Sequence, residues 1–95
     1  MSQRDAARFV ASVKGRVQGV GYRLFVRSRA EERHLTGSVR NMPNQSVRVE
    51  AEGPREALEA LIEDLREGPP AARVDRVDVE WHPPSGAKQF RIESG

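Results

Sequence analysis

The chain has 95 residues, which is enough for one compact domain with a small core and too few for two. Its 37% hydrophobic content and net charge of +2 are typical of a folded protein, so we expect a single domain over residues 1–95 with its core from about residue 8 to 93. The absence of cysteine excludes disulfides, thiolate metal sites and cysteine nucleophiles. The surplus of 16 basic over 14 acidic residues is too small to predict a nucleic-acid surface.

The chain also carries no signal for a membrane or a metal. No apolar run approaches the roughly 20 residues that a membrane-spanning helix needs, and the polar start lacks the apolar segment of a signal peptide. We therefore expect a cytoplasmic protein with no membrane partner. His34 and His82 lie far apart without a metal-ligand pattern around them, so we expect no metal site.

The first half of the chain predicts two strands around a helix. Residues 8–14 alternate between apolar and polar, which indicates a strand, and a glycine-rich stretch follows at 15–21. From 22 to about 33 apolar residues recur at spacings of three to four, which predicts an amphipathic helix. Residues 36–42 are typical of a second strand.

The second half predicts a hairpin, a helix and two further strands. Turn residues at 43–46 lead into an alternating strand over 47–52. A second helix opens at Gly53-Pro54, and Gly68-Pro69-Pro70 stops it; its buried stripe comprises Leu58, Leu61, Ile62 and Leu65. A fourth strand follows over 76–81, and a short one over 90–92.

This order, β-α-β-β-α-β with a short final strand, predicts an α+β fold of the ferredoxin-like type. In that sandwich a four-stranded antiparallel sheet carries both helices on one face, with the first and third strands in the middle. The short fifth strand is an addition to it. The sheet of a single chain covers the apolar faces of its own two helices, so no second chain is needed to bury them. We therefore expect a monomer. The fold hosts enzymes, RNA-binding modules and ligand sensors, so it does not decide the function.

The glycine-rich stretch carries the functional argument. Three glycines in the segment 15–21 allow positive φ, and the next helix begins directly afterwards. Unpaired amides, the positive end of the helix dipole and missing Cβ atoms together predict a cradle for a tetrahedral oxyanion. Arg23 falls in the first helical turn, and its guanidinium can reach back into this cradle.

Two better-known glycine motifs do not fit this segment. A Walker A loop ends in Gly-Lys-Ser or Gly-Lys-Thr, which is absent, and Leu24 occupies the position of the third glycine in the dinucleotide-binding fingerprint. On glycine content alone, a strand-to-helix connection without any ligand is an equal alternative.

The segment Gly15-Arg16-Val17-Gln18-Gly19-Val20-Gly21-Tyr22-Arg23 resembles the phosphate-loop signature of the acylphosphatase family over its full length. Gly37-Ser38-Val39-Arg40-Asn41 resembles that family's second motif. The similarity runs from about Val10 to Ile92 and includes Gly68-Pro69-Pro70 and Phe90-Arg91-Ile92. Three departures are His34, where members often carry glycine after the first helix, Asn44-Gln45-Ser46, where the hairpin often carries Asp-Gly, and Ser38, where tryptophan is frequent.

The resemblance implies a small hydrolase that splits acyl phosphates into carboxylate and inorganic phosphate, with no metal and no other cofactor. Its two catalytic residues carry over onto Arg23 and Asn41. The phosphate-binding residues carry over onto Gly15, Arg16, Val17, Gln18, Gly19, Val20, Gly21, Tyr22 and Arg23. Arg23 and the loop amides are expected to hold the phosphoryl oxygens, and Asn41 to orient the attacking water, because an asparagine cannot accept a proton near neutral pH.

Three other functions stay open at this point. An RNA-binding module of the same topology needs aromatic residues on its central strands, and residues 47–52 offer none. A non-catalytic anion sensor needs the loop and Arg23 but not Asn41. A fragment of a larger carbamoyl-phosphate-processing enzyme would contain a similar domain.

Overall fold

Two helices and five strands follow one another in the computed structural model, which describes residues 6–94. In chain order they are β1 (Ala6–Arg16), α1 (Tyr22–Glu32), β2 (Thr36–Asn41), β3 (Val47–Pro54), α2 (Arg55–Glu67), β4 (Arg73–His82) and β5 (Phe90–Glu93). Every expected element is present in the expected order. β1 and β4 extend beyond the alternating segments because they pair with each other over most of their length. Residues 1–5 and 95 of the expected domain lie outside the described residues.

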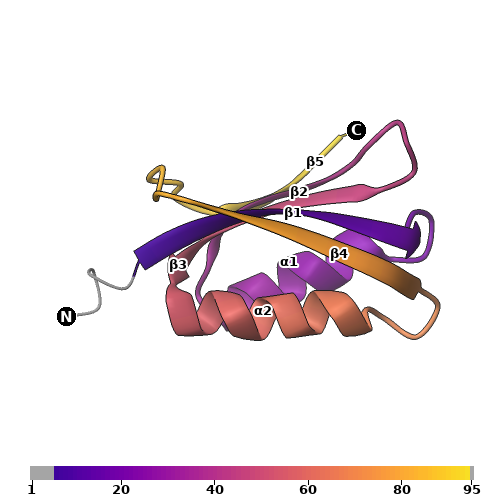
Figure 1. Ribbon diagram of the computed structural model, residues 1–95, viewed down its shortest axis with the longest axis horizontal. Helices are drawn as coiled ribbons and strands as arrows, with labels where there is room; N and C mark the ends of the chain where they lie inside the picture. The colour runs from indigo at the N-terminus through magenta and orange to yellow at the C-terminus, as the bar shows by residue number, and fades with distance from the viewer. Residues whose placement is uncertain (1–5, 95) are drawn as a thin grey trace.

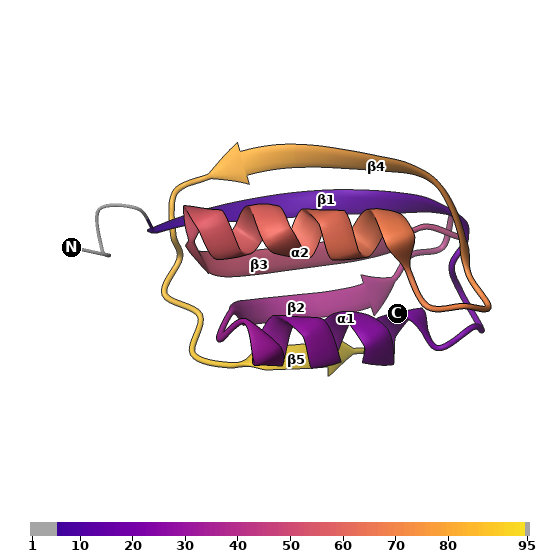
Figure 2. The same ribbon diagram turned by 90° about the horizontal axis from the view of Figure 1, so that it is seen from below.

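The strands form a single sheet in the order β4-β1-β3-β2-β5. The pairs β1–β3, β1–β4 and β2–β3 are antiparallel, and β1 and β3 lie side by side in the interior of the sheet, as predicted. The fifth strand adds to the edge of β2 and runs parallel to it, so the complete sheet is mixed. The connection over residues 83–89 crosses one end of the sheet from β4 to the opposite edge (Figure 2), which sets the direction of β5.

Both helices pack on the same face of the sheet (Figure 1), which confirms the predicted ferredoxin-like sandwich. α1 lies against β2 and β5, whereas α2 lies against β1, β3 and β4. The predicted stripe of α2 is buried and meets the inward-facing residues of the strands. These include Phe9, Ala11, Val13, Val39, Val47, Val49 and Ala51. The other face of the sheet carries charged side chains and no helix.

At the end of α1, His34 takes a position where glycine is the more usual residue. His34 has a φ of 58°, in the left-handed region. Its backbone nitrogen donates to the carbonyl of Glu31 at 3.0 Å, and that of Leu35 donates to Ala30 at 2.9 Å. This pair of bonds closes the helix in the manner of a Schellman motif and seats Leu35 in the core.

Neither described helix is long and apolar enough to cross a membrane.

Candidate active site

The loop between β1 and α1 begins two residues later than the sequence indicates. Gly15 and Arg16 belong to β1, where they pair with Val74 and Arg73 across a register shift. Gly15 has a φ of 133°, and a Cβ there would overlap the carbonyl oxygen of Arg73 and lie 2.8 Å from the nitrogen of Asp75. The first glycine of the motif therefore allows β1 and β4 to approach, and the open loop comprises residues 17–21.

Gly19 and Gly21 give this loop the properties of an anion cradle. Their φ angles are 74° and 81°, and a Cβ at either position would meet no atom within 4 Å. Gly21 is the residue that precedes α1, and no side chain caps the helix there. The first turn of α1 also contains no acidic residue. Its leading amides and the positive end of its dipole are therefore available to an anion.

A cavity of about 130 Å³ opens beside this loop and brings the two predicted catalytic residues together. Arg23 reaches it from the first turn of α1, and Asn41 reaches it from the last residue of β2. Figure 2 shows why they meet: the β1–α1 loop lies at the end of the sheet where β2 and β5 finish. Arg23 and Asn41 are 18 residues apart in sequence and line the same cavity.

The backbone of β5 holds the guanidinium of Arg23. Nη1 of Arg23 donates to the main-chain carbonyl of Glu93 over 3.2 Å. A carbonyl accepts from one edge of the planar guanidinium and leaves its remaining donors for a ligand. The short fifth strand is thus part of the site, which the sequence did not indicate, because any residue at position 93 supplies a carbonyl.

Asn41 carries an unpartnered polar atom. Its side-chain oxygen Oδ1 is buried and has no hydrogen-bond partner among the described residues. Leaving a buried polar atom unpaired costs about 1–3 kcal/mol, and such atoms are rare in folded proteins. The carboxamide at the cavity therefore has hydrogen-bonding capacity that the fold does not use.

Gln18 fixes the distance between the two halves of the site. Its side-chain Nε2 donates to the carbonyl of Met42 at 2.9 Å and to that of Ser46 at 2.8 Å. These carbonyls belong to the β2–β3 turn, directly after Asn41. Both N–H groups of the amide are used in this clamp, so the side chain of Gln18 supports the turn and has no donor left for an anion.

Tyr22 anchors the start of α1 in the core. Its hydroxyl donates to the carbonyl of Leu65 in α2 at 2.8 Å, and burial raises the pKa of its phenol well above the usual value. The side chain is 1% exposed. The hydroxyl of Tyr22 is thus bound within the core and is not offered to a ligand.

The structure thus separates the predicted phosphate-binding residues into two groups. Those that line the cavity are Val17, Gly19, Gly21, Tyr22 and Arg23, together with Asn41. Gly15, Arg16, Gln18 and Val20 do not line it. Val17 is fully buried in the core and Val20 packs against it, so the loop is anchored on both sides of Gly19.

Leu24 is a cavity residue that the sequence analysis did not single out. Its side chain is 59% exposed, which is unusual for leucine, and it lines the cavity beside Arg23. The available signal was its place outside the apolar stripe of α1, whose buried members are Tyr22, Val26 and Ala30.

Over residues 6–94, no three or more histidine, aspartate or glutamate side chains are grouped so that they could hold a metal ion. The residues that line the cavity include one cation, Arg23, one carboxamide, Asn41, and no acid. That arrangement suits an anion with several oxygens.

The comparisons with known proteins point in one direction. The model of the acylphosphatase family matches residues 9–92. The chain belongs to the acylphosphatase family. An acylphosphatase of Thermus thermophilus is 51% identical to it over 85 residues, which cover 90% of this chain and 97% of that protein. The structure of an acylphosphatase from Coxiella burnetii is similar with a TM-score of 0.93 at 36% identity, covering 98% of both chains.

Membership of this family makes the chain an enzyme that hydrolyses acyl phosphates. A domain of the same fold also occurs inside a much larger protein. The structure of full-length HypF in its phosphate- and nucleotide-bound form is similar with a TM-score of 0.86 at 32% identity, but the match covers 94% of this chain and 12% of HypF.

Proposed function

We propose that this acylphosphatase-family enzyme holds the phosphoryl group of its substrate in the 130 Å³ cavity between the loop, Arg23 and Asn41. The proposal rests on one observation. The open loop, the uncapped start of α1, a guanidinium and an unpartnered carboxamide all meet at this cavity. Amides of the cradle and the free donors of Arg23 bind the phosphoryl oxygens. Guanidinium groups match such oxygens in a bidentate manner.

The reaction needs positioning more than acid–base chemistry. Phosphoryl transfer passes through a loose transition state whose charge is spread over the equatorial oxygens, so fixed donors stabilise it. Water attacks phosphorus, the bond from phosphorus to the carboxylate oxygen breaks, and the products are carboxylate and inorganic phosphate. The proton of the water leaves to a phosphate oxygen or to solvent. A carboxylate is a good leaving group and requires no general acid, so the reaction proceeds without a metal.

Asn41 orients the attacking water through its carboxamide. The unpartnered Oδ1 supplies the acceptor that such a water needs, and the side chain lies at the end of β2, which the Gln18 clamp holds against the loop. By analogy with the loss of an oxyanion-hole donor, removing this carboxamide lowers kcat by about 10²–10³.

Leu24 forms the apolar side of the cavity mouth, where the acyl group leaves. Leu24 is 59% exposed, whereas Val17 and Tyr22, which also line the cavity, are buried. Contact with an apolar acyl group would remove both surfaces from water. We therefore propose a preference for acyl phosphates with apolar acyl groups.

The test is hydrolysis of benzoyl phosphate in the presence of a chelator, with inorganic phosphate as competitor. We expect wild-type activity, inhibition by phosphate, and near-complete loss in both Arg23→Ala and Asn41→Ala. Arg27→Ala is the matched control, because Arg27 lies on the next turn of α1 and does not line the cavity. Full activity of folded Arg23→Ala would contradict the proposal, and phosphate binding without hydrolysis in wild type would indicate a sensor.

We propose further that the enzyme acts as a cytoplasmic monomer, independent of nucleic acid and membranes. The measured mass in solution and the activity at dilution test the monomer: the specific activity stays constant as the protein concentration falls.

A further inference from the structure

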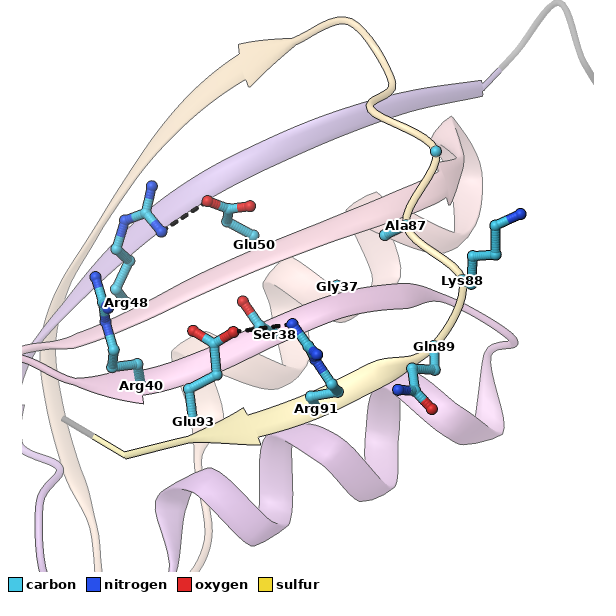
Figure 3. A pocket seen from close by; sticks show the side chains of 11 residues that line it. Gly37, Ser38, Arg40, Arg48, Glu50, Ala87, Lys88, Gln89, Arg91 and Glu93 are labelled. Carbon is cyan, nitrogen blue, oxygen red and sulfur yellow. Dashed lines mark hydrogen bonds and ion pairs between the residues drawn. The ribbon is translucent and has the colours of Figure 1, made fainter.

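A second hollow lies on the face of the sheet that no helix covers. Its volume is about 470 Å³, and it extends over β2, β3, β5 and the end of the 83–89 connection (Figure 3). We call it the open-face hollow. It is open to solvent and larger than the 130 Å³ cavity beside the glycine-rich loop.

The open-face hollow carries a net positive charge. Its charged lining residues are Arg40, Arg48, Lys88 and Arg91 against Glu50 and Glu93. Four positive and two negative charges leave an excess of +2, which equals the formal net charge of the whole chain. The remaining charges of the molecule therefore balance, and the surplus is concentrated at this hollow. Its field attracts multivalent anions.

Ion pairs use only half of these cations. Arg48 contacts Glu50, with 2.6 Å between Nη1 and Oε2, and Arg91 contacts Glu93, with 3.3 Å between Nη2 and Oε2. None of the ion pairs between described residues involves Arg40 or Lys88. Both acids of the hollow are already paired, so they offer nothing further to these two cations.

The strand register adds a specific reason for a ligand. Arg40 of β2 lies directly opposite Arg48 of β3. Like charges at directly opposed positions of a sheet are destabilising. Arg48 forms an ion pair with Glu50. Arg40 lies opposite Glu93 on its other side, but the ion pair of Glu93 is with Arg91 and not with Arg40. Figure 3 shows both arginine side chains rising at the same end of the hollow. An oxyanion between two such guanidinium groups would convert a repulsive pair into two attractive ones.

We propose that the open-face hollow binds a linear phosphate chain, with one phosphate between Arg40 and Arg48 and the chain running toward Arg91 and Lys88. The volume favours a chain over orthophosphate. All 11 lining residues are non-aromatic, so the hollow has no platform on which a base could stack, and an inorganic triphosphate is the expected ligand. This site lies outside the residues proposed for catalysis.

The experiment is a calorimetric titration of tripolyphosphate into the enzyme at low ionic strength, with inorganic phosphate present in excess to occupy the cradle. We expect one binding event in wild type and in Arg23→Ala, and at least tenfold weaker binding in the double variant Arg40→Gln/Arg48→Gln. The control is Arg73→Gln/Arg76→Gln, which removes two exposed arginines of β4 and leaves binding unchanged. A midpoint of thermal unfolding that tripolyphosphate raises in wild type and in the control, but not in the hollow variant, supports the same site.

Other outcomes overturn the proposal. Absence of any binding event with phosphate present, or equal weakening in the control, leaves no specific site on this face. Loss of the event in Arg23→Ala alone places the ligand in the cradle. ATP serves as the second arm: affinity equal to that of tripolyphosphate supports recognition of the phosphate chain, whereas much tighter binding of ATP contradicts an inorganic ligand. The readout is binding, so it does not depend on the catalytic roles of Arg23 and Asn41.

Discussion

Replacing Tyr22 by phenylalanine separates the stability of this fold from its chemistry. The Tyr22 hydroxyl donates to the carbonyl of Leu65, near the end of α2. In a continuing helix that carbonyl would accept from the residue four positions later, which is Pro69 and has no N–H. The backbone nitrogen of Gly68 is already bound to Asp64. The phenol therefore replaces a backbone donor that the sequence cannot supply.

The expected loss of unfolding free energy follows from the carbonyl of Leu65 that is left unpaired. Tyr22→Phe keeps the ring but leaves a buried carbonyl unpaired, which costs about 1–3 kcal/mol. A central loss of about 2 kcal/mol lowers Tm by about 8–16 °C in a domain of this size. Ser28→Ala removes an exposed hydroxyl from the same helix and serves as the control, with a change within about 0.5 kcal/mol.

The assay combines thermal unfolding with kinetics. We expect Tyr22→Phe to retain its KM for benzoyl phosphate and its inhibition by phosphate at 25 °C, because the phenol points into the core and not into the cavity. An unchanged Tm would refute the argument about the Leu65 carbonyl, and a raised KM would show that the hydroxyl contacts substrate.

Ionisation of the Tyr22 phenol gives a second test, the direction in which stability changes with pH. Burial raises the pKa of Tyr22 in the folded state above the value of about 10 in the unfolded chain. The unfolded state therefore releases the proton first, and the stabilisation is complete below about pH 10 and falls as the pH rises further. Tyr22→Phe loses this dependence on alkaline pH.

Five further variants test other contacts. Gly15→Ala is expected to lower the unfolding free energy by about 1–3 kcal/mol or more in chemical denaturation, since its Cβ would overlap the backbone of β4. Leu24→Ser raises KM for benzoyl phosphate severalfold but leaves that for acetyl phosphate unchanged, and equal effects on both substrates would exclude contact with the acyl group. Deletion of residues 93–95 lowers kcat because the acceptor of the Arg23 guanidinium is lost, whereas Glu93→Ala, which keeps the carbonyl, retains it. Glu52→Gln loosens the 83–89 connection, seen as faster amide exchange at residues 85–87.

The Glu52 carboxylate also makes the stability of the fold fall at acidic pH. Burial by itself raises its pKa, but hydrogen bonds from the amide of Gly86, the amide and hydroxyl of Ser85 and the amide of Ala87 together lower it. Its contribution to stability is therefore present above the unfolded-state pKa and is lost as the pH falls through the folded-state value.

The order of the elements was readable from the sequence because each strand and helix has its own period of apolar residues. The glycine-rich loop before α1 was readable for a similar reason: glycine spacing, followed at once by an arginine, is a local pattern. Asn41 needed the family motif, because one asparagine at the end of a strand is ordinary turn chemistry.

The hydrogen bonds that hold the site together could not be predicted from local sequence patterns. The Gln18 clamp joins residues 24 and 28 positions apart, and the contact of Arg23 with Glu93 spans 70 positions. Both contacts end on main-chain carbonyls, which have no sequence signature. The opposition of Arg40 and Arg48 depends on the hairpin register, which only the folded sheet defines.

The most direct test of the proposed division of roles is calorimetric binding of inorganic phosphate to wild type, Arg23→Ala and Asn41→Ala. If Arg23 and the cradle bind the phosphoryl group while Asn41 orients water, Asn41→Ala binds phosphate nearly as tightly as wild type despite its loss of turnover. Arg23→Ala then loses phosphate affinity by at least tenfold. Undiminished phosphate binding by folded Arg23→Ala would contradict the account.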